Sequence, residues 1–274
     1  MRAICIPGEN PSAMTGSGTN TWLLCGTEPV LIDAAQNTDA YAARVAETLE
    51  REQPGATLSR LLVTHAHPDH IGGVSAIKRR WPDVICAKLP DPDRDEQYLP
   101  AAEWTPVADE AVIKAGNILL WAIHTPGHAP DHLCYFEPRS STLFCGDLIV
   151  NGGTVMIPVS SGGNLAQYMK SLRRVLDLQP RRALAGHGDP IENPAALIRA
   201  YIGHRLMREQ QILDVLGKGP ASVDEIVRRV YQSLQPELEK AAAENVLAHL
   251  LKLRSERRVM EDVEASSWSL PASP

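Results

Sequence analysis

The segment Thr64-His65-Ala66-His67-Pro68-Asp69-His70 constrains this chain most, because it places three imidazoles and a carboxylate within one short stretch. Neutral imidazole nitrogens and carboxylate oxygens are ligands that zinc and similar divalent ions accept. The preceding apolar run from Arg60 to Thr64 predicts a buried strand, and the apolar spacing from Ile71 to Trp81 predicts a helix. α/β folds place their sites in such a loop between strand and helix. The sequence therefore predicts a metal site at the carboxyl end of a strand.

Three later positions repeat this arrangement of a metal-binding residue after a strand. His128, Asp147 and His187 each directly follow a glycine, and each comes shortly after an apolar run. Glycine allows the backbone to turn closely around a bound ion. Any one of these residues alone is more often structural, but four such strand ends are difficult to attribute to chance. The candidate metal ligands are therefore His65, His67, Asp69, His70, His128, Asp147 and His187.

The first two thirds of the chain alternate short strand-like runs with a few helical stretches, which predicts a mixed α/β (α+β) fold. The proline- and aspartate-rich segment Pro90 to Pro106 predicts a surface loop. Helices are expected over Ala40 to Gln53 and Asn164 to Leu178. The expected strands are Arg2 to Ile6, Thr21 to Cys25, Pro29 to Ile32, Leu61 to Thr64, Ile118 to Ile123, Leu133 to Phe136, Thr142 to Cys145 and Arg182 to Ala185.

After about Pro194 the pattern becomes almost wholly helical. Ser222 predicts the N-cap of one helix, with Glu225 completing a capping box. Three helices followed by a short hairpin indicate a winged helix. The helices are expected over Ala196 to Leu216, Ser222 to Ser233 and Pro236 to Arg254, and the hairpin over Arg258 to Glu264 and Ser266 to Leu270.

Composition limits the remaining possibilities. A chain of 274 residues with 44% hydrophobic content can bury one large core and a small second domain, and its net charge of −6 gives no bulk attraction to polyanions. Pro7 and Gly8 interrupt the amino terminus before a signal-peptide core forms, and no apolar run approaches membrane-spanning length. The five scattered cysteines are expected to be buried and reduced. We therefore expect a cytoplasmic protein that does not enter membranes.

In their order and spacing, the candidate ligands resemble the motif of the metallo-β-lactamase superfamily, His-x-His-x-Asp-His followed by a later His, an Asp and a final His. This resemblance implies an αββα sandwich over residues 1–203, followed by a small helical winged-helix-like C-terminal domain over residues 204–274. It also implies two metal ions: one held by His65, His67 and His128, a second held by Asp69, His70 and His187, and a bridge between them formed by Asp147.

Residues that are not ligands narrow the resemblance to the lactamase-beta-2-like branch, which carries a tail of this size. Members of that branch include single-strand-selective endoribonucleases, and related fungal enzymes hydrolyse polyketide thioesters. True β-lactamases of the superfamily generally place Cys or Ser where Asp147 stands, which argues against a dedicated antibiotic hydrolase. The supporting segments are Gly18 to Leu23, Thr125 to His132, Tyr201 to Arg205 and Arg208 to Leu213.

The chemistry implied is that of a dinuclear metal-dependent hydrolase with two divalent ions, expected to be Zn²⁺. Such a pair can share a bridging hydroxide, a nucleophile at neutral pH. Asp69 is a catalytic candidate because its free oxygen can orient the nucleophile and pass a proton to the leaving group. His132 is the second catalytic candidate, as a hydrogen-bond donor to the site or to substrate. Asp33 is either a hydrogen-bond partner of a ligand histidine or an ordinary cap or turn residue.

Several alternatives stay open. The expected substrate is single-stranded RNA or a small ester, thioester or lactam, so a glyoxalase-II-like thioesterase or a promiscuous β-lactam or ester hydrolase competes with the endoribonuclease. A DNA-binding regulator with a vestigial metal site and a mononuclear iron dioxygenase of the persulfide type are further hypotheses. Acidic and basic residues balance over Pro236 to Arg254, which favours a lid or packing module over a groove-reading helix. A homodimer is also open.

Three histidines are left outside the predicted site. His124 is expected to be packed or hydrogen-bonded. His204 is expected to make a hydrogen bond that joins the two domains, while the branch resemblance leaves a role facing the substrate open. His249 is expected on an exposed helix face.

Overall fold

The computed structural model describes residues 2–12, 15–36, 38–232 and 234–271. Within these residues, a first sheet contains six strands in sequential order, with the first three antiparallel and the last four parallel to one another. These strands are β1 (Arg2–Pro7), β2 (Asn20–Cys25), β3 (Val30–Ile32), β4 (Arg60–Leu62), β5 (Ile85–Lys88) and β6 (Trp104–Pro106).

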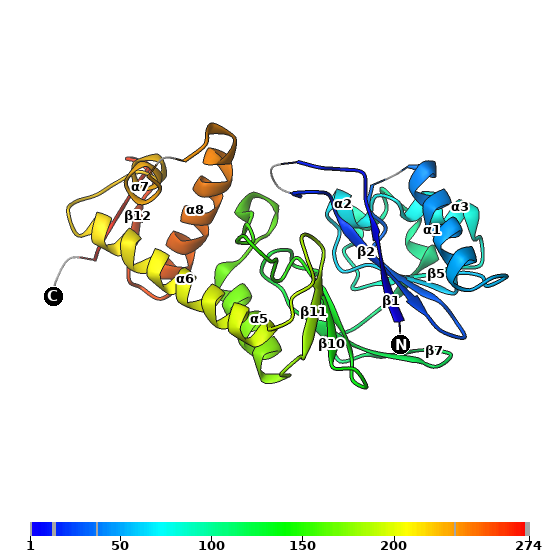
Figure 1. Cartoon of the computed structure of the whole chain (residues 1–274). Helices are drawn as coiled ribbons and strands as arrows, with labels where there is room; N and C mark the ends of the chain where they lie inside the picture. Colours follow the sequence, from blue (N-terminus) through cyan, green and yellow to red (C-terminus); the bar gives the residue numbers. More distant parts are fainter. Residues whose placement is uncertain (1, 13–14, 37, 233, 272–274) are drawn as a thin grey trace.

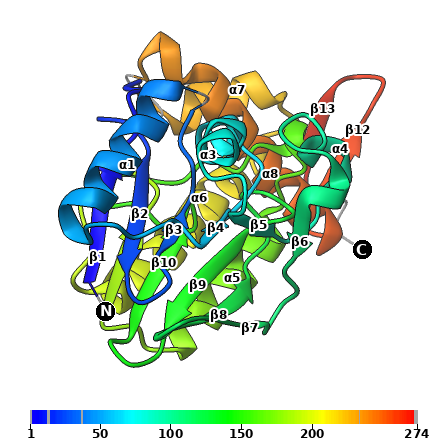
Figure 2. The same ribbon diagram turned by 90° about the vertical axis from the view of Figure 1, so that its right-hand side faces the viewer.

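A second sheet of five described strands has the order β11-β10-β9-β8-β7. Its pairs are antiparallel except for β10 with β11, which run parallel. Figure 2 shows the two sheets as neighbouring layers, with α1 and α3 on the outer side of the first. The strands are β7 (Val112–Ala115), β8 (Ile118–His124), β9 (Leu133–Glu137), β10 (Thr142–Gly146) and β11 (Arg182–Ala185).

Side-chain alternation along the strands separates the buried core into layers, because successive residues of a strand point to opposite faces. Leu24 of β2 packs between the sheets with Phe144 of β10. Its neighbour Leu23 packs on the other face, with residues of helix α1 (Asp39–Glu52) and α3 (Val74–Arg80). Each fully buried leucine side chain contributes about 2 kcal/mol. Helix α5 (Leu165–Asp177) covers the outer face of the second sheet, which completes the predicted αββα order.

Three further helices and a hairpin form the C-terminal part (Figure 1). The predicted capping box is confirmed, because Ser222 accepts from the Glu225 N–H and Glu225 accepts from the Ser222 N–H. Ser233, the predicted end of that helix, lies outside the described residues. Helix α6 runs unbroken through the expected boundary at residues 203 and 204, so that boundary stays a prediction. The elements are α6 (Pro194–Leu216), α7 (Val223–Val230), α8 (Glu239–Ser255), β12 (Met260–Asp262) and β13 (Ser267–Ser269).

The prediction for Pro90 to Pro106 is confirmed in that most of the segment is exposed, but it is wrong in calling the segment a loop. The segment contains helix α4 (Pro92–Asp95), and its last three residues form β6 at the edge of the first sheet. Asp95 is buried because its carboxylate lies 2.7 Å from the ammonium group of the equally buried Lys88. A charged side chain is buried when it has such a partner.

The prediction of buried cysteines is confirmed for Cys86, Cys134 and Cys145, which are buried and free. It is wrong for Cys5, which is exposed on the edge strand β1, and Cys25 is half-buried. In the described part of the chain, no helix combines the length and the apolar character needed to span a bilayer.

Candidate metal centre

The candidate ligands come from loops at one edge of the sandwich. His65 and His67 follow β4, while Asp69 and His70 lie on the one-turn helix α2 (Pro68–Ile71). Proline suits the first position of a helix, because its missing N–H would be unpaired there in any case. The remaining ligands follow three strands of the second sheet, β8, β10 and β11. The structure therefore brings residues from both sheets to one place.

Two of the glycines before these residues are needed for close approach. A Cβ atom on Gly186 would lie 2.6 Å from both the Asp147 Oδ1 and the His70 Cε1 atoms, so a side chain there would enter the candidate site. Gly127 has φ +138°, and a Cβ atom would lie 2.4 Å from the backbone of Tyr168. Glycine therefore lets these two loops pack against the centre.

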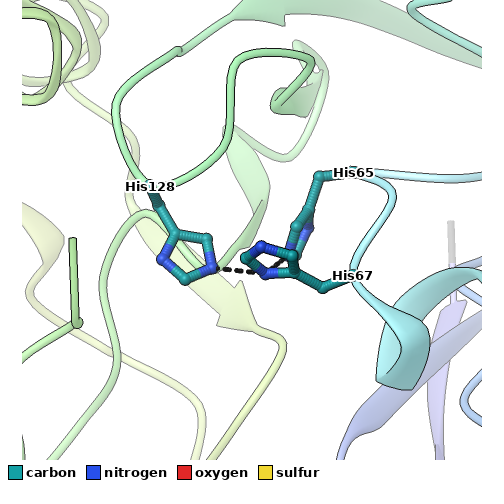
Figure 3. A group of neighbouring side chains, drawn as sticks. All are labelled: His65, His67 and His128. Atoms are coloured by element: carbon teal, nitrogen blue, oxygen red, sulfur yellow. Dashed lines mark hydrogen bonds between the residues drawn. The ribbon is translucent and has the colours of Figure 1, made fainter. Parts of the chain in front are cut away.

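The first group consists of His65, His67 and His128, whose side chains point toward one another in Figure 3. The Nδ1 atom of His67 lies 2.9 Å from the Nε2 atom of His65 and 2.9 Å from the Nε2 atom of His128. Three ring nitrogens therefore converge on one point from two loops.

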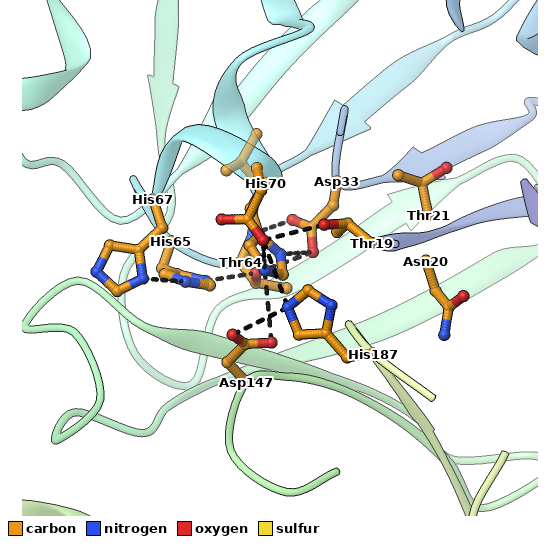
Figure 4. A network of polar contacts seen from close by, with 12 residues as sticks. Thr19, Asn20, Thr21, Asp33, Thr64, His65, His67, His70, Asp147 and His187 are labelled. Atoms are coloured by element: carbon orange, nitrogen blue, oxygen red, sulfur yellow. Dashed lines mark hydrogen bonds and ion pairs between the residues drawn. The ribbon is translucent and has the colours of Figure 1, made fainter. Parts of the chain in front are cut away.

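The second group consists of Asp69, His70 and His187. Figure 4 shows Asp147 between the histidines of this group and those of the first. The Nε2 atom of His187 lies 3.4 Å from carboxylate oxygens of both aspartates, and so does that of His70. Asp147 also lies 3.6 Å from His128. One carboxylate thus contacts histidines of both groups.

The outer hydrogen bonds determine which nitrogens face inward. His128 donates through Nδ1 to the Met156 carbonyl at 2.7 Å, and His70 donates through Nδ1 to Asp33 at 2.8 Å. His187 Nδ1 donates to the Gly18 carbonyl at 3.3 Å. Metal-binding histidines characteristically use one nitrogen in this way, which leaves the lone pair of the other for the ion. Among the described residues, the buried inward nitrogen of His70 has no hydrogen-bond partner. The donor set therefore fits divalent metal ions.

Of the two roles expected for Asp33, the structure shows the contact with a candidate ligand histidine, His70. The Asp33 side chain is buried, and its oxygens also accept from the backbone N–H of Thr64 at 2.7 Å and from the Thr64 hydroxyl at 3.0 Å. Because that hydroxyl donates to Asp33, it accepts from the Nδ1 atom of His65 at 3.0 Å. Asp33 is thus connected to ligand candidates in both groups.

Asp69 has a hydrogen-bond partner, Thr19, that was not predicted from the sequence. The Thr19 hydroxyl donates to the Asp69 Oδ2 atom at 3.0 Å, and the Asn10 amide in turn donates to Thr19 at 2.9 Å. Thr19 belongs to the Gly18 to Leu23 segment, whose resemblance to the lactamase-beta-2-like branch was the available signal. The contact fixes one oxygen of the carboxylate.

The structure places His132 behind the centre. Its ring is fully buried, with Nδ1 2.8 Å from the Thr125 hydroxyl and Nε2 accepting from the backbone N–H of Asp147 at 3.1 Å. Both ring nitrogens are therefore engaged by the protein. Burial, together with the nearby His128, lowers the pKa of His132 well below its usual value.

The histidines outside the site differ from one another. His124 has the expected hydrogen bond, at 2.8 Å from the Pro130 carbonyl. The prediction of an exposed His249 is wrong, because its side chain is only 1% exposed. The buried side chain of His249 lies near Arg205 of α6, and the neighbouring Ala248 belongs to the core around α5. Half-buried His204 has no hydrogen-bond partner for Nδ1 among the described residues.

The histidines of the two groups have pKa values shifted in opposite directions. Burial lowers the pKa of His65, His67 and His128, and with the neighbouring His128 it lowers the pKa of His67 to about 3. Burial also opposes charge at His187, but the Asp147 carboxylate outweighs it and raises the pKa of His187 to about 10.

In His70, Asp69 and Asp147, as in His187, neighbouring charges outweigh the effect of burial on the pKa. Burial disfavours an imidazolium at His70, yet the carboxylates of Asp147 and Asp69 raise its pKa well above the usual value. Burial likewise disfavours the two carboxylates, but the adjacent His70 lowers the pKa of both. The metal-free centre therefore holds protonated histidines beside charged aspartates.

Comparison with known families settles which fold family these residues belong to. The profile of the metallo-beta-lactamase superfamily matches residues 14–187, which contain the whole candidate centre. The chain belongs to the metallo-beta-lactamase superfamily. A second profile, the beta-lactamase associated winged helix domain, matches residues 222–268. The predicted superfamily and the predicted C-terminal winged helix are both confirmed, and the chain is a metal-dependent hydrolase.

Relatives match almost the whole chain. A beta-lactamase-like protein 2 homolog from Drosophila melanogaster is 36% identical over 277 residues, which cover 93% of this chain and 89% of the relative. An atrochrysone carboxyl ACP thioesterase from Passalora fulva is 32% identical over 279 residues, which cover 96% and 79%. The crystal structure of a beta-lactamase domain protein from Burkholderia ambifaria superimposes with a TM-score of 0.84 at 19% identity and covers 98% and 91%, which shows the shared fold.

We predict that metal binding by this superfamily member releases protons. At pH 7.5 both His70 and His187 are protonated in the metal-free protein, because their pKa values are raised, that of His187 to about 10. A metal ion requires neutral imidazoles, so each histidine loses about one proton on binding. Affinity should therefore increase as the pH rises toward 10, by about tenfold per pH unit for each proton released.

Calorimetric zinc titrations of chelator-stripped protein, in buffers with different ionisation enthalpies, measure this release. The His187→Gln variant serves as the control and should release about one proton fewer. A zinc affinity that does not change between pH 6 and pH 8 would contradict the predicted protonation.

Proposed function

We propose that this chain is a dinuclear zinc hydrolase in which His65, His67 and His128 hold one ion and Asp69, His70 and His187 hold the second. Asp147 bridges the two. The observation that carries the proposal is the arrangement of the imidazoles. Their inner nitrogens converge, while the outer nitrogen is paired with a protein group in His65, His70, His128 and His187. Nitrogen and carboxylate ligands suit zinc.

Bound divalent ions supply an activated water molecule at neutral pH and polarise the oxygen of the bond under attack. The chain's own residues then handle protons and positions. We assign to Asp69 the transfer of a proton to the leaving group, with Thr19 fixing its carboxylate. We assign to His132 a positioning role, supported by the hydrogen bond that it accepts from the Asp147 N–H.

We propose a thioester as the substrate. Support comes from the relative named atrochrysone carboxyl ACP thioesterase, which matches 96% of this chain. Hydrolysis of a thioester needs attack at a carbonyl carbon and stabilisation of the oxygen that becomes negative, and a metal centre of this kind serves both. Single-stranded RNA is the competing substrate, expected from the resemblance to the lactamase-beta-2-like branch.

A substrate panel tests this proposal. Zinc-loaded protein is offered acyl thioesters of N-acetylcysteamine, an unstructured oligoribonucleotide and a β-lactam. Thioester hydrolysis is followed by the loss of ultraviolet absorbance, because the exposed thiol of Cys5 would react with a thiol reagent. We expect thioester turnover. Cleavage of RNA without thioester turnover would replace the thioesterase proposal by an endoribonuclease, and turnover of no substrate would contradict both.

Metal analysis tests the dinuclear proposal separately. Two zinc ions per chain are expected from the two groups of ligands, and one iron ion per chain would select the mononuclear dioxygenase instead. We also propose a cytoplasmic location, supported by five free cysteines, which are typical of reducing compartments. The domain boundary near residue 203 and a homodimer stay proposals, to be tested by limited proteolysis and by light scattering.

A further inference from the structure

The segment between β10 and α5 supports one metal ligand candidate directly. The carbonyl of Met156 in this segment accepts the hydrogen bond from His128 Nδ1 at 2.7 Å. The position of that carbonyl therefore sets how the His128 ring faces His67, whose Nδ1 atom lies 2.9 Å from the His128 Nε2 atom. Displacement of Met156 would turn the ring away from the centre.

Two side chains of the C-terminal helices hold the backbone on both sides of Met156. Asn245 of α8 accepts from the backbone N–H of Ile157 at 3.2 Å. Arg205 of α6 donates through Nη2 to the Val155 carbonyl and through Nη1 to the same Asn245 oxygen at 3.2 Å. One amide oxygen thus joins the segment to both helices.

Burial makes these contacts hard to replace. Arg205 is 4% exposed, and both Val155 and Ile157 are buried, so water has little access to the groups if a partner is lost. The guanidinium group also lies over the Tyr168 ring of α5, 5.5 Å from its centroid. Buried donors without a partner are costly. The segment therefore depends on Asn245 and Arg205 for its position.

In this chain the third helix of the C-terminal part contacts the rest of the protein, whereas in many related folds the corresponding helix contacts DNA. The third helix of many helix-turn-helix folds reads the DNA groove. In this chain the third helix, α8, directs Asn245 to Ile157 and Glu244 to the backbone N–H of Ser160, at 3.2 and 3.1 Å. Its Ala248 belongs to the core around α5. This face of α8 is occupied by the rest of the chain.

We propose that Asn245 and Arg205 are positioning residues for His128, so that the winged-helix domain forms part of the support of the metal centre. The inference rests on the proposed role of His128 as a metal ligand. Groups that orient a ligand from outside commonly contribute 10- to 100-fold to metal affinity. Loss of the Asn245 oxygen should therefore lower the affinity for the ion held by His65, His67 and His128.

The test compares Asn245→Leu with Asn245→Asp. Leucine has a similar size but cannot accept a hydrogen bond, whereas aspartate keeps an oxygen for Ile157 and Arg205. Zinc affinities are measured by competition with a chromophoric chelator. We expect Asn245→Leu to lower the affinity for one of the two zinc ions by about 10- to 100-fold. Asn245→Asp should keep the wild-type affinity. The d–d absorption of the cobalt-substituted protein should change with leucine alone.

Glu244→Ala is the matched control, because it removes a contact from the same helix to the same segment, four residues from Met156. It should lower the thermal midpoint of the stripped protein without changing zinc affinity or the cobalt spectrum. If Asn245→Leu does not fold, Arg205→Lys replaces it, because lysine lacks the fork that reaches both Val155 and Asn245, and the same weakening is expected.

The outcomes separate this inference from the proposed function. Wild-type protein that binds two ions, with unchanged affinities in Asn245→Leu or its replacement Arg205→Lys, would overturn the positioning role alone. Equal weakening in Glu244→Ala would also overturn it, because the effect would then report general loosening of the segment. Wild-type protein that binds no metal would overturn the proposed function and this inference together.

Discussion

Asp147→Ala is expected to lower kcat/KM by about 1,000-fold or more, a loss of about 4 kcal/mol in transition-state stabilisation. The carboxylate lies 3.4 Å from ring nitrogens of His70 and His187 and 3.6 Å from that of His128. It therefore joins the two groups of candidate ligands, and alanine cannot replace either oxygen. Without it, the two groups of candidate ligands would share no carboxylate, and divalent ions would be held too weakly for hydrolysis.

Steady-state kinetics on the preferred substrate of the panel, together with metal content per chain, measure this loss. The control is Asp189→Ala, which removes the same charge from an exposed position two residues after His187. Asp189→Ala should retain wild-type kinetics. An Asp147→Ala protein with at least a tenth of the wild-type activity and two bound ions would rule out the bridging role.

The positions of the candidate ligands were predictable because each lies close after a short apolar strand. His128, Asp147 and His187 each follow a glycine at a strand end, so they could be predicted without knowing which strands pair with one another. The division into two sheets was implied only by the resemblance to a family. All but the last residue of β2 are buried, and two adjacent residues of this strand, Leu23 and Leu24, pack in different layers of the core. A strand buried on both faces has no polar alternation to reveal which side meets a helix.

Other features depend on contacts between distant parts of the chain. Strand β5 ends in Lys88, which looks like a surface residue in the sequence but lies buried between Asp95 and Asp131 at 2.7 and 3.1 Å. His249 was predicted to be exposed because the partner of its helix face is not visible in local periodicity. The support of His128 by a backbone carbonyl has no side-chain signal at all, because any residue at position 156 supplies that oxygen.

Asp33→Asn is expected to destabilise the metal-free protein by about 3 kcal/mol. It should also lower the zinc affinity of the proposed site that contains His70 by about 10- to 100-fold. Asp33 is buried, and its Oδ2 atom accepts from His70 Nδ1 at 2.8 Å and from the Thr64 hydroxyl at 3.0 Å. Asparagine can keep the other contact, to the Thr64 backbone N–H. Its amide NH₂ would then face the proton on His70, donor against donor, and the raised pKa of His70 would fall.

Asparagine is the informative replacement because the backbone at Asp33 has φ 63°, a conformation that asparagine adopts more readily than most other residues. The measured loss therefore reports the side-chain contacts and not backbone strain. Urea unfolding of chelator-stripped protein gives the stability, and chelator competition gives the zinc affinity. Asp39→Asn, at an exposed ion pair with Arg79, should change stability by less than about 1 kcal/mol. An Asp33→Asn protein with wild-type stability and zinc affinity would show that His70 holds its orientation without this carboxylate.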